Sequence, residues 1–220
     1  MKKLLIWDFD GVIADTEHIA MNMWQNALIK YGINWSFEET VKNIMGKGQK
    51  AQFALLQQYN KQITFDDVKN DIHNAVNLAI QKNINLTNGV EDIFNIQNFA
   101  QCIATGNAPE GIKARVEPLG LNRYFSQEQL FSANLVKRGK PEPDLFLYAA
   151  DKMGFEPKNC IVIEDSLTGL TAGLRAKMLT LAFVEHAVLE KDKYVEDIKA
   201  LRINNIFENM KELKAFLSGL

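Results

Sequence analysis

The sequence has few of the residues that mark a metal-rich or disulfide-stapled protein. Its 220 residues include 2 cysteines, 3 histidines and 5 prolines. Cys102 and Cys160 both lie inside apolar, strand-like runs. Buried apolar surroundings favour reduced thiols, so we expect neither a disulfide nor a metal-binding cysteine pair. The fold therefore has to be stabilised by its apolar core.

A surplus of one charge and a long hydrophobic run are also absent. The chain carries 25 basic and 27 acidic residues, a formal net charge of −2. Proteins that bind nucleic acid usually carry a basic surplus, so we expect no nucleic-acid partner. The first apolar stretch ends at Asp8, which makes it too short for a signal peptide or a membrane helix. We therefore expect a cytoplasmic protein that does not associate with membranes.

What the chain does contain is an alternation of apolar strand-like runs and helical patterns. The run from Leu4 to Trp7 is continuously apolar and stops at a carboxylate, which is typical of a strand buried on both faces. The pattern predicts further strands at 101–104, 130–132, 160–163, 179–183 and 206–207. It predicts helices at 90–97, 110–119, 144–153, 167–176 and 210–217. Such alternation indicates parallel strands joined by right-handed crossovers.

One segment near the start departs from this alternation. Apolar residues recur at helical spacing from 19 to 31 and stop at Gly32. Ser36 and Glu39 form a capping box that predicts a helix to about residue 45, and a further helix is predicted over 68–80. The expected fold is α/β: a Rossmann-like parallel-sheet core of residues 1–14 and 87–220, with an all-α cap domain, residues 15–86, inserted after the first strand.

Four polar fragments follow, or lie near the end of, the predicted strands. They are Asp8-Phe9-Asp10-Gly11-Val12, Thr105-Gly106-Asn107, Lys140-Pro141 and Glu164-Asp165-Ser166. The carboxyl ends of parallel strands share one crevice in an open α/β sheet. Residues more than 150 positions apart can therefore meet there, and we expect one reaction centre.

The residue types point to phosphoryl transfer. A carboxylate nucleophile divides the very slow hydrolysis of a phosphate monoester into formation and breakdown of an acyl phosphate. Asp8 is the candidate nucleophile, and Asp10 the candidate acid that protonates the leaving oxygen and later activates water. The hydroxyl of Thr105 and the amides of Gly106 and Asn107 would donate hydrogen bonds to the phosphoryl oxygens.

Charge counting predicts a metal ion in the same place. Asp8, Asp10, Glu164 and Asp165 would bring four negative charges together if all were ionised. A divalent cation and the ammonium of Lys140 supply three positive charges, and a proton on Asp10 completes the balance. Oxygen ligands suit a hard cation, so we expect Mg²⁺ held by these four acidic residues. Lys140 would also bind the transferring phosphoryl group.

At these fragments the chain resembles the haloacid dehalogenase superfamily, in its phosphatase and beta-phosphoglucomutase-like branch with a helical cap. The resemblance implies that Asp8 is the nucleophile and that Asp10 is the acid/base, whose backbone carbonyl also binds Mg²⁺. It implies that Thr105 and Lys140 bind phosphate. Glu164 and Asp165 would be the metal-side carboxylates.

The resemblance also implies that the inserted helices close over the site and carry substrate selectivity. Thr16 belongs to the motif that begins at Asp8, and relatives place a substrate-contacting loop where this chain has Gly46-Lys47-Gly48-Gln49. Lys47 or Lys50 would then engage an anionic or hydroxylated leaving group; a flexible glycine turn with solvated lysines is the other interpretation. The substrate-binding candidates are therefore Thr16, Gly46, Lys47, Thr105, Gly106, Asn107 and Lys140.

These residues predict a Mg²⁺-dependent phosphatase that hydrolyses a small phosphorylated metabolite, a sugar, sugar-acid or polyol phosphate, through an aspartyl phosphate. We expect a monomer or weak dimer. The alternative is a beta-phosphoglucomutase-like phosphosugar mutase, but those mutases carry a histidine where this chain has Ala20. A remote alternative is a receiver-type phospho-switch, which needs neither the helical insert nor Asp10.

One turn departs from the resemblance. Many relatives have Ala-Gly-Met after the last metal motif, whereas this chain has Ala176-Lys177-Met178. If the turn requires a positive φ, Lys177 adopts a backbone conformation that favours glycine.

Overall fold

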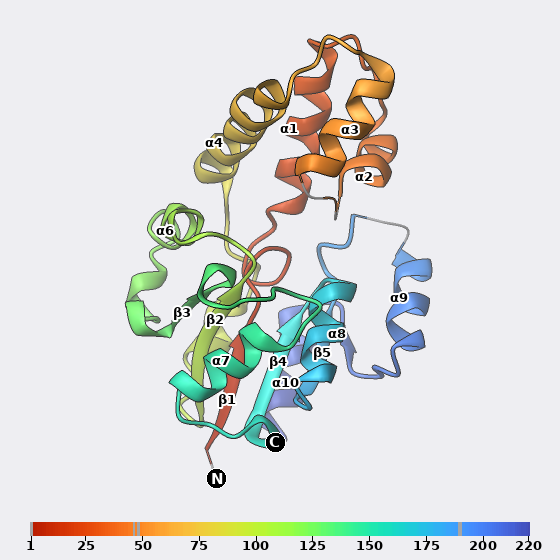
Figure 1. Cartoon of the computed structure of the whole chain (residues 1–220). Coiled ribbons are helices and arrows are strands. Elements are labelled where there is room, and N and C mark those ends of the chain that lie inside the picture. Colours follow the sequence, from red (N-terminus) through yellow and green to blue (C-terminus); the bar gives the residue numbers. More distant parts are fainter. Residues whose placement is uncertain (1, 46, 48, 189–190) are drawn as a thin grey trace. The chain divides into compact units, whose positions relative to one another are not determined.

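A computed structural model of the chain describes residues 2–45, 47, 49–188 and 191–220. These residues form two compact units (Figure 1). The core unit consists of Met1–Asp15 and Asn85–Leu220, and the insert unit of Thr16–Ile84. The expected limits of a cap domain, 15–86, stay a prediction about function, because compactness alone does not make the insert a cap.

The core unit is built on a parallel sheet. The strands are β1 (Lys3–Trp7), β2 (Phe99–Thr105), β3 (Leu130–Ser132), β4 (Cys160–Glu164), β5 (Leu179–Phe183) and β6 (Ile206–Phe207). Their order is β3-β2-β1-β4-β5-β6, and every neighbouring pair is parallel. The parallel α/β prediction is therefore confirmed. Trp7 lies opposite both Ile103 and Ile163, so the chain leaves β1 between the ends of β2 and β4.

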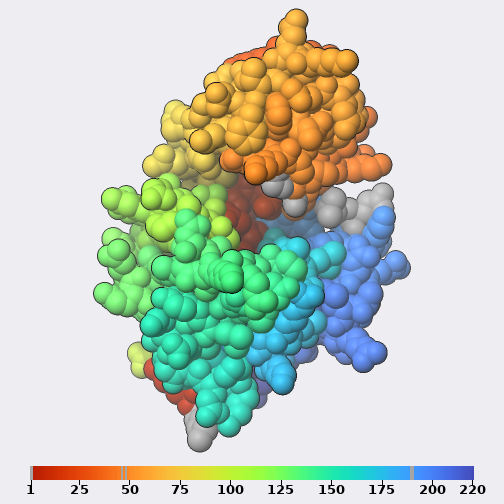
Figure 2. Space-filling view, in the orientation of Figure 1, coloured from red at the N-terminus to blue at the C-terminus, as the bar shows by residue number. Residues whose placement is uncertain are grey.

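Successive side chains of a strand point to opposite faces of the sheet, and in β1 the apolar side chains of both sets are buried. Helices therefore cover both faces. Leu4 and Ile6 pack in one apolar cluster with α7 (Asp144–Lys152) and α8 (Leu167–Arg175). The segments of α7, teal, and α8, cyan, lie next to each other on the face shown in Figure 2. On the other face, the Trp7 ring meets Phe94 of α5 (Val90–Phe94) at a centroid distance of 5.4 Å. The α10 helix (Met210–Ser218) contacts α5.

Both cysteines are buried free thiols, as predicted, and they belong to the α7 and α8 cluster. The turn after α8 does have a positive φ at Lys177, which lies two residues beyond the helix and has φ +58°. A non-glycine residue in this region of backbone space is uncommon, so Lys177 adopts a backbone conformation that favours glycine.

Some helical predictions in the core unit were wrong in extent or missing. The helix expected at 90–97 is the shorter α5, which ends at Phe94, and the helix expected at 110–119 is α6, Pro109–Val116. The α9 helix (Lys191–Ala200) was not predicted. Ile198 is its one buried residue among those described, so its sequence lacks the apolar stripe by which a helix is recognised.

The insert unit is helical. It contains α1 (Glu17–Ile29), α2 (Phe37–Ile44), α3 (Gln49–Tyr59), a π-helical turn (Asp67–Ile72) and α4 (His73–Asn83). The capping box is confirmed: Ser36 Oγ accepts from the Glu39 amide at 3.1 Å, and Glu39 Oε2 accepts from the Ser36 amide at 2.8 Å. The helix predicted over 68–80 begins as the π-turn, and α3 was not predicted separately. Among the described residues between 16 and 84 we find no strand, as expected.

No helix in the described part of the chain combines the length and the apolarity needed to cross a membrane.

Candidate active site

The register of β1 and β4 brings two acidic residues together. The Asp8 amide donates to the Ile163 carbonyl at 2.9 Å, which continues the pairing of the strands one residue further. Glu164 is the last residue of β4, so it lies beside Asp8. The two residues are only 6% and 1% exposed, respectively. The strand ends therefore hold two carboxyl groups in one buried place, as predicted.

The turn after β1 depends on Gly11. This residue has φ +79°, and its amide donates to the Ala14 carbonyl at 2.8 Å. A Cβ atom at this position would lie 1.9 Å from Asp165 Oδ2, far inside van der Waals contact. Glycine therefore permits both the left-handed turn and its close approach to Asp165.

Lys140 joins the two buried carboxylates. Its Nζ donates to Asp8 Oδ1 and, at 2.7 Å, to Glu164 Oε2. Burial alone would lower the pKa of the Lys140 ammonium, but the two carboxylates outweigh burial and hold this pKa above its ordinary value. Lys140 is thus a fixed positive charge, as predicted.

Glu164 is held by the two residues that precede α8 as well as by Lys140. Its Oε1 accepts hydrogen bonds from the Asp165 amide at 3.1 Å, the Ser166 amide at 3.0 Å and the Ser166 hydroxyl at 2.9 Å. Burial would raise the pKa of Glu164, but the Lys140 ammonium and the Ser166 donors hold it below its ordinary value. Glu164 is therefore an ionised carboxylate of fixed orientation.

The environment of Asp8 raises the pKa of its carboxyl group, in contrast to that of Glu164. Burial, together with the negative charges of Glu164 and Asp10, raises the pKa of Asp8 from 3.8 to about 8, although the Lys140 ammonium opposes the shift. A nucleophilic carboxylate must be ionised, so this site calls for further positive charge close to Asp8.

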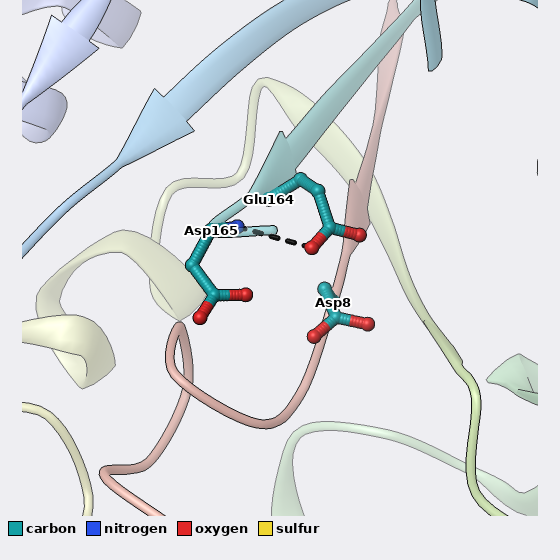
Figure 3. Close-up of side chains that lie close together, drawn as sticks. All are labelled: Asp8, Glu164 and Asp165. Carbon is teal, nitrogen blue, oxygen red and sulfur yellow. Dashed lines mark hydrogen bonds between the residues drawn. The ribbon is translucent and has the colours of Figure 1, made fainter. Parts of the chain in front are cut away.

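Three carboxylates can supply ligands for that charge. Asp8, Glu164 and Asp165 each offer one oxygen, and these oxygens all lie within 4.8 Å of one another. Figure 3 shows the three groups at the ends of β1 and β4, with the Asp165 amide directed at the Glu164 carboxylate. An all-oxygen set with surplus negative charge fits a hard divalent cation. The side chain of Asp10 is not part of this cluster, and its backbone carbonyl as a metal ligand stays a prediction.

The Asp10 side chain is bound by two core-unit residues. Its Oδ1 accepts from Arg115 Nε at 2.9 Å, and its Oδ2 accepts from Asn107 Nδ2. Arg115 adds a positive charge that the sequence-based count omitted. With Lys140 and a divalent cation, the positive charges near the site would number four, as many as the four carboxylates.

The predicted phosphate-binding residues lie at the end of β2. Thr105 is 1% exposed, and its Oγ1 accepts from the Asn107 amide at 3.2 Å and from Asn107 Nδ2 at 2.9 Å. Gly106 between them is exposed. Asn107 therefore links the Thr105 hydroxyl to Asp10.

The remaining substrate-binding candidates are not in the core unit. Thr16 is buried at the start of α1 in the insert unit. Lys47, also in the insert unit, is exposed and donates to the Lys42 carbonyl at 2.9 Å, and Lys50 is exposed. Gly46 lies outside the described residues. The role of these four residues at the substrate stays a prediction.

Sequence reasoning missed two residues that support the cluster. Arg115 binds Asp10, and the Tyr194 hydroxyl of α9 donates to the Asp165 carbonyl. Arg115 had a detectable signal, because it lies three residues after Ile112 and one before Val116 on the face of α6 that turns out to be buried. Tyr194 belongs to the unpredicted helix and had none.

Several relatives are named as phosphatases. A fructose-1-phosphate phosphatase of Escherichia coli (strain K12) is 27% identical over 177 residues, covering 79% of this chain and 92% of the relative. A phosphorylated carbohydrates phosphatase of Thermotoga maritima is 23% identical, covering 84% and 86%. A bifunctional riboflavin kinase/FMN phosphatase of Arabidopsis thaliana is 23% identical, and the match covers 92% of this chain but only 56% of that protein.

Solved structures share the whole fold. A haloacid dehalogenase-like protein of unknown function from Agrobacterium tumefaciens has a TM-score of 0.85 at 22% identity, covering 100% of this chain and 99% of the other. A HAD family hydrolase from Deinococcus radiodurans, solved with bound phosphate and sodium, has a TM-score of 0.84 at 24% identity, covering 99% and 95%.

A family profile decides the assignment. The profile described as haloacid dehalogenase-like hydrolase matches residues 5–183, which include all four polar fragments, the whole insert unit and most of the core unit. The resemblance found in the motifs is thereby confirmed. The chain belongs to the haloacid dehalogenase-like hydrolases.

Proposed function

We propose that the protein is a Mg²⁺-dependent phosphatase of small phosphorylated metabolites, and that Asp8 carries the phosphoryl group between two half-reactions. One observation supports this most strongly. The buried Asp8 carboxylate accepts a hydrogen bond from the Lys140 ammonium, and one of its oxygens lies within 4.8 Å of an oxygen of Glu164 and of Asp165. A nucleophile, a cation for the phosphoryl oxygens and a metal-binding set thus converge.

Each core residue has a role in the proposed reaction. Asp8 attacks phosphorus, while Lys140 and Thr105 bind the phosphoryl oxygens. Asp10 donates a proton to the leaving oxygen and then accepts one from the attacking water. A divalent cation, bound by Asp8, Glu164 and Asp165, would supply positive charge to the phosphoryl oxygens and favour the ionised form of Asp8. Loss of that cation should therefore abolish turnover.

The substrate class rests on the relatives. Two of them are named for fructose 1-phosphate and for phosphorylated carbohydrates, and both align over most of their length. We propose a sugar, sugar-acid or polyol phosphate as substrate, selected by the insert unit acting as a cap through residues such as Thr16 and Lys47. The cytoplasmic location and the monomeric or weakly dimeric state expected from the sequence stay predictions.

The test is phosphate release from a panel of sugar, sugar-acid and polyol phosphates, with Mg²⁺ and with a chelator. We expect turnover only with the metal, and loss of more than about 10³-fold in kcat for Asp8→Asn, as is usual when a nucleophile is removed. The matched control is Asp92→Asn, which alters an exposed aspartate of α5 paired with Lys214 and should keep full activity. Activity that survives Asp8→Asn would refute the proposal.

The same assay separates the mutase alternative. A phosphosugar mutase returns the phosphoryl group to a sugar, so chromatography would find an isomerised hexose phosphate and little free phosphate. Ala20, in place of the mutase histidine, favours hydrolysis. Free phosphate in stoichiometric amounts would therefore exclude the mutase.

A further inference from the structure

Arg115 is a buried arginine bound to Asp10. It lies in α6, it is 7% exposed, and its Nε donates to Asp10 Oδ1 at 2.9 Å. A second donor of the same guanidinium, Nη1, binds the Gly111 carbonyl one turn earlier at 3.1 Å. The planar guanidinium is therefore fixed to its own helix and has a defined direction toward Asp10.

The other oxygen of Asp10 is held from a different element. Asn107 Nδ2 donates to Asp10 Oδ2, and the Asn107 carbonyl accepts from the Ser132 hydroxyl at 2.6 Å. Ser132 ends β3, so Asn107 is anchored to the sheet. The carboxyl group of Asp10 is thus bound at both oxygens, by one group fixed to α6 and one fixed to β3.

The packing of α6 leaves room for this arrangement. A Cβ atom at Gly111 would lie 3.5 Å from Arg115 Nη1 and 3.4 Å from Asn107 Cβ, which is ordinary contact distance. A side-chain methyl group at position 111 would therefore make ordinary contacts with Arg115 and Asn107.

We propose that Arg115 is a positioning residue for the phosphatase reaction: it orients the carboxyl group of Asp10 toward the leaving oxygen. The inference rests on the proposed function. As the bond from phosphorus to the leaving oxygen breaks and the bond to Asp8 forms, the proton of Asp10 passes to that oxygen. Arg115 keeps its own protons throughout and does not touch the substrate.

The test compares two leaving groups. A sugar alkoxide needs a proton as it departs, whereas p-nitrophenolate leaves without one, so a fault in Asp10 affects the sugar phosphate more. With the best sugar phosphate of the panel, we expect Arg115→Met to lower kcat/KM by about 10- to 100-fold, within the range of general acid catalysis. With p-nitrophenyl phosphate, the loss should stay below about threefold.

A double-variant cycle shows whether Arg115 acts through Asp10. If it does, Asp10→Asn with Arg115→Met should be no slower than Asp10→Asn alone, within about twofold. Losses that multiply in the double variant would overturn the proposal. So would losses that are equal for both leaving groups.

Controls separate folding from positioning. Arg123→Met removes an exposed arginine that pairs with Glu91 and should leave both rates unchanged. Arg115→Lys keeps the positive charge but lacks the planar guanidinium. It should give a smaller loss of kcat/KM, with the same dependence on the leaving group. If Arg115→Met does not fold, the lysine variant decides by the same criteria. If Asp8→Asn retains activity, the proposed function fails; if only the Arg115 criteria fail, the positioning role alone is lost.

Discussion

The Asp8 carboxyl group is buried between an ammonium and a second carboxylate. Its pKa is raised to about 8, first by burial and then by Glu164, whereas the pKa of Glu164 is lowered by Lys140 and the donors of Ser166. The same buried environment thus shifts the pKa values of the two carboxyl groups in opposite directions. Asp8 is left as the group whose ionisation depends on a bound cation.

This asymmetry predicts a pH-dependent stability of the metal-free protein. Between pH 4 and 8 the folded chain holds a proton on Asp8 that the unfolded chain has lost, so the free energy of unfolding falls as pH rises. The limiting slope is about 1.4 kcal/mol per pH unit. In chelator, we expect the stability of the wild type relative to Asp8→Asn to fall by about 1–2 kcal/mol from pH 6.5 to 8.

The other groups with shifted pKa values do not cause the same fall in the free energy of unfolding between pH 6.5 and 8. Because the pKa of Lys140 is raised on folding, its contribution to the free energy of unfolding is constant at every pH below about 10. The pKa of Glu164 is lowered on folding, so its contribution is lost only in acid. Burial lowers the pKa of His73, which increases stability as pH rises toward 6.5 and cancels in the comparison of the two proteins. The measurement is denaturant titration of both proteins. If the difference in free energy of unfolding between wild type and Asp8→Asn stays constant from pH 6.5 to 8, the raised pKa of Asp8 is contradicted.

Prediction from sequence succeeded for residues whose positions follow from strand ends. Asp8, Thr105 and Glu164 each end or follow a strand, and parallel register alone brings Asp8 beside Glu164. Arg115 was missed because helix periodicity marks its face as buried without saying what lies opposite. Its partner Asp10 is 105 positions away, and this pairing exists only once α6 is packed.

At the scale of elements, α8 shapes the metal-side carboxylates. A Cβ atom on Gly169 would lie 1.7 Å from Glu164 Oε2, the oxygen that binds Lys140. We expect Gly169→Ala to displace this carboxylate and to weaken Mg²⁺ binding by about 10- to 100-fold, as supporting residues of metal sites do. Isothermal titration calorimetry measures the affinity directly.

The same helix contains a control. A Cβ atom on Gly173 would lie 2.6 Å from Thr180 Oγ1 on β5, away from the carboxylates. Gly173→Ala should lower stability by about 1–3 kcal/mol through overpacking and leave the affinity for Mg²⁺ unchanged. Equal loss of affinity in both variants would show that α8 acts only through general packing.

Elements were predictable where apolar residues recur and not elsewhere. All six strands of the sheet were found because buried parallel strands are continuous apolar runs. The α3 and α9 helices were missed because few of their described residues are buried, Gln52 and Leu56 in α3 and Ile198 in α9. Packing of single residues stabilises such helices without leaving a periodic pattern.

At the scale of the whole molecule, the insert begins and ends at neighbouring points of the core unit. The Thr87 amide donates to the Ile13 carbonyl at 2.8 Å, and the Thr87 hydroxyl donates to the Val12 carbonyl at 2.7 Å. Ala14 and Leu86 form an antiparallel bridge. The core unit thus holds both ends of the insert together without the help of the insert itself.

Replacement of residues 16–84 by a short Gly/Ser linker should therefore leave a folded core. If the insert selects the leaving group, we expect this variant to hydrolyse p-nitrophenyl phosphate but to lose selectivity. The ratio of kcat/KM for the best sugar phosphate to that for p-nitrophenyl phosphate should fall at least about tenfold. Circular dichroism verifies folding, and an unchanged ratio would contradict the cap role of the insert.

The substrate itself was beyond prediction from the sequence. The core motifs are short and local, whereas the proposed selectivity would depend on side chains of the insert such as Lys47, whose contacts with a substrate the sequence does not specify. Periodicity identifies helices in the insert and carries no information on the groups that a substrate would contact.

The central claim is that Asp8 carries the phosphoryl group, and a crystal structure of the protein with Mg²⁺ and beryllium fluoride tests it most directly. Beryllium trifluoride binds a carboxylate oxygen in the manner of a phosphoryl group. We expect beryllium bonded to an oxygen of Asp8, with Lys140 and Thr105 against the fluorides. An adduct on Asp10, Glu164 or any other residue would contradict the account.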